Sequence, residues 1–171
     1  ITGGTTSNVY FNTVWLNGSS SGALFGASSI SASTTPALTL RNNIFVNTST
    51  PAGATGYASA YRRSTTTLTT YNAASNNNLF YAGTPGPNNL IFFDGTNSDQ
   101  TLAAYKTRVS TRDAASVTEN PPFLSTTGSS ANFLHINTAI ATQVESAATP
   151  VAGITDDFDG DVRNVATPDI G

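Results

Sequence analysis

The sequence has no cysteine, no methionine and only one histidine, His135, among its 171 residues. Without cysteine the chain can form no disulfide, and it has neither a thiol nucleophile nor a thiolate metal ligand. A single histidine likewise excludes a histidine-rich metal site. Charged residues make up only 10%, and the seven basic residues never form a run longer than Arg62–Arg63. Binding to a phosphate backbone needs a basic stripe, so we expect no nucleic-acid partner.

Long hydrophobic runs and helical patterns are also scarce. No window approaches the roughly 18 apolar residues of a membrane span, and no basic amphipathic helix is present, so we expect no membrane insertion. Instead, 28 Thr, 19 Ser and 17 Asn fill more than a third of the chain. Ser, Thr and Asn weaken helices, whereas Thr, Val, Tyr and Phe suit strands. The composition therefore predicts an all-β chain of short strands, with one helix at 101–109 capped by Asp99 or Ser98.

One pattern recurs three times: an Asn, a second polar residue and then three apolar residues, at 12–17, 42–47 and 77–81. The offsets of 30 and then 35 residues predict a solenoid of about three stacked coils. Asn12, Asn42 and Asn77 would occupy equivalent corners, because Asn tolerates the left-handed backbone and its side chains can bond along the stack. The alternative is three buried strands in a sandwich. We assign 1–95 to the coils and 96–171 to a short helix and C-terminal cap of the same domain.

Aromatic residues follow the same repeat. Trp15, Phe45 and Phe80 fall at near-equivalent positions, so we expect them to stack inside the coils. The N-terminal coil would leave Val9 and Val14 half exposed at an open end, because residues 1–7 form no amphipathic helix to cover it. We therefore expect upstream coils or another subunit to cover that end.

A second aromatic set is a candidate for carbohydrate binding. Aromatic rings stack on sugar faces, and a guanidinium group can bind a carboxylate through two hydrogen bonds. The candidate residues are Arg62, Arg63, Tyr57, Tyr61 and Tyr71. The alternative is that both arginines are solvated residues of the coils. Asp94 and Asp99 are the only acids before residue 112, so the sequence offers no convincing catalytic residue.

The C-terminal region is rich in aspartate. Oxygen ligands around a glycine turn suit Ca²⁺, which makes Asp157, Asp159 and Asp161 candidate calcium ligands. No other cofactor is indicated. The alternative is a polar turn at Asp159–Gly160, in which Arg163 pairs with Asp157 or Asp169 and closes the cap.

Several short motifs follow one another in order over roughly residues 38–171: Leu40–Asn47, Ser75–Phe80, Thr101–Tyr105, Arg112–Ser116, Asn120–Phe123, Asn132–Ile136, Asp157–Arg163 and Pro168–Gly171. Together these motifs resemble those of secreted bacterial right-handed parallel β-helix proteins of the pectate-lyase-like superfamily. The ending resembles the D-x-D-G-x-x-R…D-I-G close of many such proteins, although the chain stops before their A-x-E and has few coils, as a fragment would.

The resemblance implies a short right-handed parallel β-helix with an irregular C-terminal cap, located outside the cell or on its surface. Because the residues supply no basic and acidic cluster for catalysis, we expect a non-catalytic structural or carbohydrate-contacting role, with an extracellular polysaccharide as the partner. One alternative is a fragment of a polysaccharide lyase or glycoside hydrolase whose active-site coils lie upstream. A second alternative is a self-assembling or adhesive surface stalk.

Overall fold

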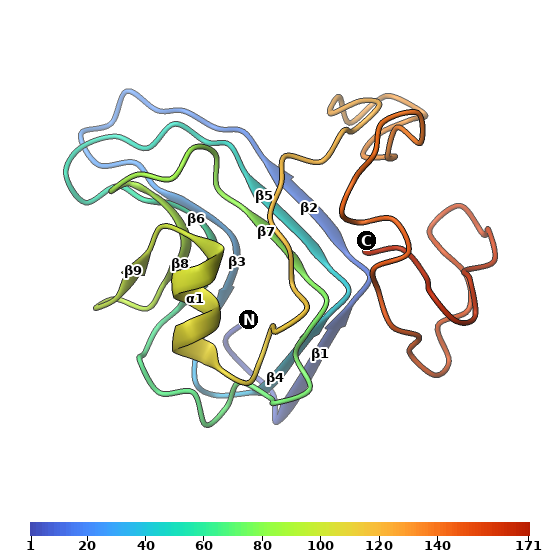
Figure 1. Ribbon diagram of the computed structural model, residues 1–171. Helices are drawn as coiled ribbons and strands as arrows, with labels where there is room; N and C mark the ends of the chain where they lie inside the picture. Colours follow the sequence, from blue (N-terminus) through green and yellow to red (C-terminus); the bar gives the residue numbers. More distant parts are fainter.

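The computed structural model describes residues 1–171 and is mostly β-structure with one short helix (Figure 1). The all-β expectation is confirmed, and so is the helix, although Thr101 caps it in place of Asp99 or Ser98. No helix here has the length and hydropathy that a bilayer crossing requires. The elements are β1 (Thr6–Tyr10), β2 (Thr13–Leu16), β3 (Ala27–Ala32), β4 (Ala37–Arg41), β5 (Ile44–Asn47), β6 (Ala58–Arg63), β7 (Leu79–Tyr81), β8 (Asn89–Phe93), β9 (Ser98–Asp99) and α1 (Leu102–Val109).

The strands form three sheets, ordered β1-β4, β2-β5-β7 and β3-β6-β8-β9. Every pairing is parallel except that of β8 with β9. We call β1, β2 and β3 the first pass of the chain, β4, β5 and β6 the second, and β7 with β8 the third. The first two passes pair at a constant offset of 31 residues, as in Thr13↔Ile44, and β5 pairs with β7 at 35, as in Ile44↔Leu79. The expected parallel pairing of 42–47 with 77–81 is confirmed.

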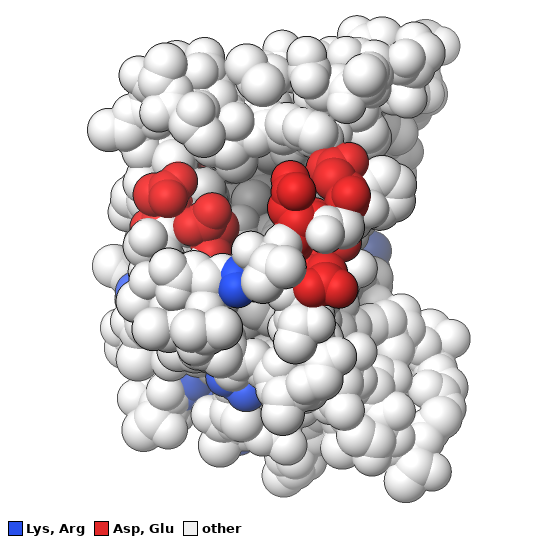
Figure 2. All heavy atoms as spheres, turned by 90° about the vertical axis from the view of Figure 1, so that its right-hand side faces the viewer, with Lys and Arg blue, Asp and Glu red and all other residues white.

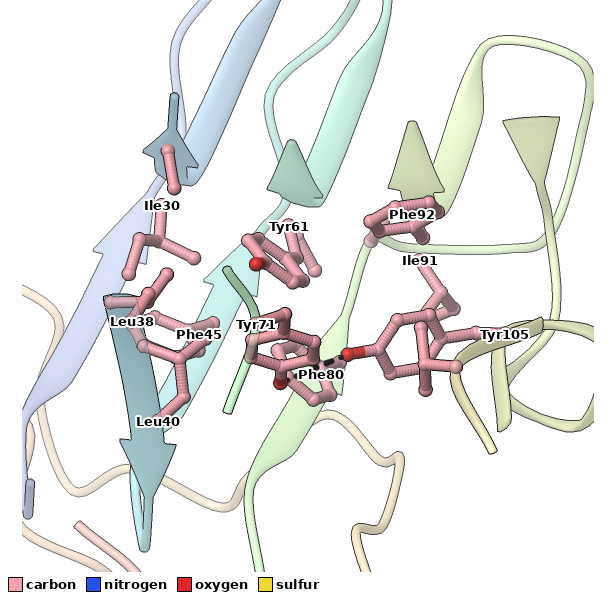
Figure 3. Close-up of a cluster of buried hydrophobic side chains, with 14 residues drawn as sticks. Ile30, Leu38, Leu40, Phe45, Tyr61, Tyr71, Phe80, Ile91, Phe92 and Tyr105 are labelled. Atoms are coloured by element: carbon pink, nitrogen blue, oxygen red, sulfur yellow. Dashed lines mark hydrogen bonds between the residues drawn. The ribbon is translucent and has the colours of Figure 1, made fainter. Parts of the chain in front are cut away.

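The space between the three sheets is filled by one hydrophobic cluster (Figure 3). Phe45 and Phe80 stack there with ring centroids 5.7 Å apart, as expected. Trp15 was wrongly placed in this stack, because the register pairs Val14 with Phe45 and Trp15 with Val46. Side chains alternate along a strand, so this one-residue shift moves Trp15 to the opposite face of β2. There it packs against a second cluster, outside the sheet.

The corner that precedes β2, β5 and β7 also differs by one residue from the expectation. The pairing places Phe11, Asn42 and Asn77 at equivalent positions, all left-handed with φ of 52°, 60° and 55°. Asn42 and Asn77 are thus equivalent, as predicted. The placement of Asn12 at the same corner is wrong, because Asn12 aligns with Asn43 and Asn78, the residues that follow the two corners. The error came from matching the first Asn of each motif, which gives an offset of 30 where the structure has 31.

The residues that follow these corners form a ladder of side-chain amides through the protein. Asn43 Oδ1 accepts a hydrogen bond of 3.1 Å from Asn12 N, and Asn78 Oδ1 accepts bonds of 3.0 and 2.9 Å from Asn43 N and Nδ2. The ladder ends where Asn78 Nδ2 donates to Asp113 Oδ1 at 2.9 Å, and Ser116 Oγ accepts from Asn78 N at the same distance. Asn43, Asn78 and Asp113 are all buried, so the ladder satisfies polar groups that water cannot reach.

The C-terminal segment, residues 119–171, lies against the outer face of the β2-β5-β7 sheet (Figure 1). Apolar side chains meet across this contact: Ile44, Val46 and Leu79 from the sheet, and Val144, Ala148 and Ile170 from the segment. The corner asparagines hold the segment in place. Asn42 Nδ2 donates to Thr149 O at 2.7 Å, and Asn77 Nδ2 donates to Ala147 O at 2.8 Å.

Arg163 closes this contact, but not through a carboxylate. Its Nε donates to Asp156 O at 3.2 Å and its Nη1 to Gly171 O at 2.9 Å, while the guanidinium lies 4.2 Å from the ring centroid of Phe11. The expected pairing of Arg163 with Asp157 or Asp169 is therefore wrong. Asp169 instead accepts a 2.6 Å hydrogen bond from Ser146 N.

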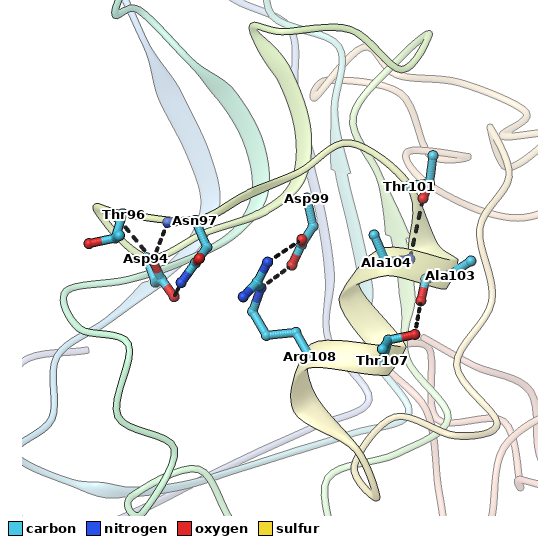
Figure 4. A network of polar contacts seen from close by, with 9 residues as sticks. All are labelled: Asp94, Thr96, Asn97, Asp99, Thr101, Ala103, Ala104, Thr107 and Arg108. Atoms are coloured by element: carbon cyan, nitrogen blue, oxygen red, sulfur yellow. Dashed lines mark hydrogen bonds and ion pairs between the residues drawn. The ribbon is translucent and has the colours of Figure 1, made fainter.

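The end of the protein after the third pass is closed by β9, α1 and the residues that follow. Arg108 of α1 donates to Asp99 of β9 from Nε at 2.5 Å and from Nη2 at 2.7 Å (Figure 4). This hydrogen bond raises the pKa of Arg108. Burial by itself raises the pKa of Asp94, but hydrogen bonds from Asn97 and Thr96 outweigh it and the pKa is lowered. Tyr105 and Val109 of α1 are buried against the interior cluster, so the helix acts as a lid.

A prediction follows for the amide ladder. Asn43→Ala should lower the free energy of unfolding by roughly 2 kcal/mol or more, because buried donors and acceptors on both neighbouring passes lose their partner. Asn12→Ala, at the exposed end of the same ladder, should cost about 1 kcal/mol or less, since water replaces the lost bonds. Urea denaturation of both variants measures the difference. Equal losses in the two variants would contradict the ladder as a buried structural element.

A second prediction concerns Arg163. Arg163→Ala should lower the free energy of unfolding by about 1–2 kcal/mol, because two hydrogen bonds and a cation–π contact are lost. Arg163→Lys should recover only part of this, since an ammonium group cannot reach both carbonyls and cover the ring. Arg62→Ala is the matched control, because the Arg62 side chain is exposed and makes no hydrogen bond. Unchanged stability of Arg163→Ala would refute this role.

Candidate functional site

A groove with a volume of about 710 Å³ lies on the outer face of the β3-β6-β8-β9 sheet. We call it the outer groove. Its most prominent side chains are Tyr57 immediately before β6, Arg62 within β6, Phe93 at the end of β8, and Leu24 before β3. The complete lining is Leu24, Gly26, Ala27, Ser28, Ser31, Thr55, Gly56, Tyr57, Ser59, Arg62, Phe93 and Gly95.

Two glycines allow the loops at one end of this groove to approach closely. A Cβ atom on Gly26 would lie 2.7 Å from both N and O of Tyr57. A Cβ atom on Gly56 would lie 2.1 Å from Ala52 O and 2.2 Å from Phe25 O. Any side chain at either position would force the two loops apart. The glycines therefore fix the position of Tyr57 at the mouth of the groove.

The parallel register builds the rest of the groove. It pairs Ser31 with Arg62 and Arg62 with Phe93, so these three residues form one row across β3, β6 and β8. The rings of Tyr57 and Phe93 lie 4.7 Å apart with an interplanar angle of 46°, and the Arg62 guanidinium is 5.7 Å from the Phe93 ring centroid. Arg62 is exposed and has no ion-pair partner. The arrangement offers aromatic surface, one free cation and several hydroxyl groups.

The structure divides the five residues predicted to bind carbohydrate. Arg62 and Tyr57 line the outer groove, whereas Tyr61, Arg63 and Tyr71 are 0% exposed and lie inside the protein. The prediction is therefore wrong for those three, because they belong to the interior cluster or pack against it. Phe93 was missed, although its 31-residue offset from Arg62 is the same as that between the first two passes. Leu24, which is 67% exposed, has no such signal in the sequence.

A second cluster of titratable groups is sealed in the interior, around Asp113. Its Oδ2 accepts bonds of 2.5 Å from Tyr71 and 2.6 Å from Tyr105, and its Oδ1 accepts bonds from Ser116 Oγ at 2.7 Å and from Asn78. Burial raises the pKa of Asp113, and the four donors oppose that rise only in part. Burial and the nearby Asp113 charge raise the pKa values of Tyr71 and Tyr105. The cluster is closed to solvent, so its role is to join the ladder to the lid.

Arg63 supplies an interior cation close to this cluster. Its Nη1 donates to Tyr61 Oη at 3.1 Å, and its Nη2 donates to Thr67 O at 3.1 Å and Thr70 Oγ1 at 3.0 Å. The guanidinium lies 5.6 Å from the ring centroid of Tyr71 (Figure 3 shows the tyrosines). Its Nε atom has no hydrogen-bond partner. Tyr71 therefore links Arg63 to Asp113, because its ring lies against the guanidinium group and its hydroxyl donates to the carboxyl group.

The aspartate loop has the geometry of a polar turn. Asp157 Oδ1 accepts hydrogen bonds from Asp159 N at 3.0 Å and Asp161 N at 2.9 Å, and Asp159 Oδ2 lies 3.2 Å from His135 Nε2. No three acidic or histidine side chains of the chain are arranged to hold a metal ion, so Asp157, Asp159 and Asp161 do not fit a calcium site. Acidic side chains nevertheless gather on this face of the protein (Figure 2).

A prediction with a defined sign follows for Asp113. Its pKa is raised in the folded state, so above pH of about 4 the folded protein retains a proton that the unfolded chain has released. The contribution of Asp113 to the free energy of unfolding should therefore fall as the pH rises through that window. Asp113→Asn cannot titrate, so the stability of the wild type minus that of the variant should decrease as the pH rises. Denaturant titrations across this pH range measure the difference.

The control for this experiment is Asp161→Asn, at an exposed position of the aspartate loop. A wild-type advantage over Asp113→Asn that grows with pH would contradict the assigned direction. Asp113→Ala should be less stable by roughly 2 kcal/mol or more at any pH, because four buried donors lose their acceptor.

Comparison with protein-family models, with curated proteins and with solved structures finds no match to this chain. The resemblance to β-helix proteins therefore rests on the sequence motifs, and the candidate site rests on the geometry of the outer groove.

Proposed function

We propose that the chain forms about three coils of a right-handed parallel β-helix, and that it is a carbohydrate-contacting part of a secreted or cell-surface protein. The near-constant offset between paired strands supports the β-helix, as does the buried amide ladder. The first two passes contribute one strand to each sheet, and the third contributes β7 and β8 to two of them, as stacked coils would. Export is supported by the absence of Cys and by the abundance of Ser, Thr and Asn.

The observation that carries the carbohydrate proposal is the partly exposed pair of rings, Tyr57 and Phe93, beside the unpaired Arg62. Sugar rings present apolar faces that stack on aromatic side chains, and their hydroxyl groups bond to polar side chains. Ser28, Ser31 and Thr55 supply such groups along the same groove. Arg62 would bind a carboxylate or sulfate of the polymer. A groove that crosses parallel strands suits an extended polymer, because a solenoid exposes a long regular face.

The groove residues support binding in preference to cleavage. Glycosidic cleavage by hydrolysis uses a pair of carboxyl groups, and proton abstraction needs a base within hydrogen-bond reach of the substrate. The outer groove contains no Asp, Glu, His or Lys side chain. The alternative of a polysaccharide lyase or glycoside hydrolase therefore places the catalytic groups on coils upstream of this chain.

Binding of acidic and neutral oligosaccharides tests the proposal. Isothermal titration of the 171-residue chain with oligogalacturonates should give saturable binding, which weakens as the salt concentration rises because Arg62 is exposed. Tyr57→Ala and Phe93→Ala should each weaken binding about 2- to 10-fold through lost stacking. Arg62→Gln should weaken binding about 10-fold or more for the acidic sugar and little for a neutral galacto-oligosaccharide.

Matched controls separate the groove from the rest of the surface. Phe158→Ala removes an aromatic ring that is 99% exposed on the C-terminal segment, and Lys106→Gln removes a cation on α1. Neither variant should change affinity. Absence of saturable binding to either sugar class, or equal losses in the groove and control variants, would overturn the proposal.

A further inference from the structure

The protein has two different ends. At one end β9 pairs with β8, Tyr71 and Asn76 bridge to β4, and Val117 bridges to β7, while α1 packs on the interior cluster. At the other end β1, β2 and β3 are the terminal strands of their sheets and pair on one side only. Residues 1–5 do not cover this end, because Ile1 and Thr5 pair with Ser33 and Ala37 in the same register as β1 and β4.

The unpaired edge presents a regular set of backbone groups. Thr5 O accepts from Ala37 N, and Phe11 N donates to Arg41 O, so the odd-numbered residues of β1 face β4. A parallel strand bonds to each neighbour from every second residue, so the amide and carbonyl groups of Asn8 face the open side. The same reasoning applies to β2, where Asn12 O and Leu16 O accept from the second pass and the Trp15 backbone faces outward.

The amide ladder defines a specific position on this edge. Each ladder residue uses Oδ1 to accept from the pass before it, as Asn43 does from Asn12 and Asn78 does from Asn43. Asn12 Oδ1 accepts no hydrogen bond within the chain. Asn12 Nδ2 is held by Tyr10 O at 2.7 Å, which fixes the orientation of this amide. The repeat therefore leaves one oriented acceptor for a donor on a preceding strand.

The apolar side chains beside the edge are only partly covered. Val9 and Val14 pack on the interior cluster and are partly buried, whereas their register partners Leu40 and Phe45 are buried. An added strand would remove the remaining surface of both valines from water. Hydrophobic burial and main-chain hydrogen bonding would thus act at the same place.

We propose that this edge binds an extended polypeptide segment by strand addition, in parallel register with β1 and β2 and with an asparagine at the ladder position. The bound segment pairs with the first pass in the same parallel register in which the first pass pairs with the second. It carries apolar residues on both sides of a corner, as residues 37–48 do. The asparagine on the added strand donates to Asn12 Oδ1, as Asn12 donates to Asn43.

A synthetic peptide tests this inference on the full chain. The probe is residues 37–48 with blocked ends, and the control peptide carries Asn43→Ala. Trp15, on β2, gives a fluorescence signal for occupancy of the edge. We expect saturable binding of the probe and at least 10-fold weaker binding of the control peptide. Absence of saturable binding up to the solubility limit of the probe, or equal binding of both peptides, would overturn the proposal.

Protein variants locate the binding edge independently. Asn8→Pro removes an outward-facing amide without breaking a bond to β4, and should weaken probe binding at least 10-fold, whereas Asn8→Ser keeps the amide and should bind as the wild type does. If circular dichroism shows that Asn8→Pro is unfolded, Asn12→Ala replaces it and should weaken the probe but not the control peptide. Self-association of the chain by light scattering, abolished by the same variant, would overturn the proposal by assigning the edge to a second copy.

Discussion

The structure depends on keeping buried amide groups hydrogen-bonded. An unpaired polar group away from water costs about 1–3 kcal/mol, so a row of buried asparagines is tolerated only if each one meets the next in register. The ladder meets this condition from Asn12 through Asn43 to Asn78. It needs a final acceptor, which is Asp113 Oδ1, while the hydroxyls of Tyr71 and Tyr105 donate to the other oxygen of the same carboxyl group. The strand register, the lid and the interior tyrosines are therefore parts of one hydrogen-bonded system.

The same two-residue corner organises the outside of the protein. In each Asn-Asn pair the second residue points into the ladder, while the first adopts the left-handed backbone and reaches the C-terminal segment. That segment has little regular structure, yet it covers the apolar outer face of the β2-β5-β7 sheet. Side-chain amides from the corners provide the hydrogen bonds that a strand pairing would otherwise supply. The irregular cap is thus positioned by the regular part of the chain.

Side-chain direction also separates the candidate site from the interior. Arg62 and Arg63 are adjacent in sequence, but one lies exposed in the outer groove and the other is buried against Tyr61 and Tyr71. An arginine inside the protein needs partners within reach, and the tyrosine hydroxyl and threonine oxygens meet most of its donors. The outer groove keeps Arg62 unpaired, which leaves its charge available to a ligand.

By itself the sequence determined the β class, the single helix, the parallel pairing of the recurring motifs and the left-handed corners at Asn42 and Asn77. These follow from composition, local backbone preference and a repeat that is visible along the chain. Only the tertiary structure decided which Asn joins the ladder, which face carries Trp15, and whether an aromatic or basic residue is inside or outside. The physical reason is that these outcomes depend on a register of 31 residues, and a shift of one residue reverses every side chain. Asp113 and Phe93 acquire their roles only from that register, because no local pattern distinguishes them.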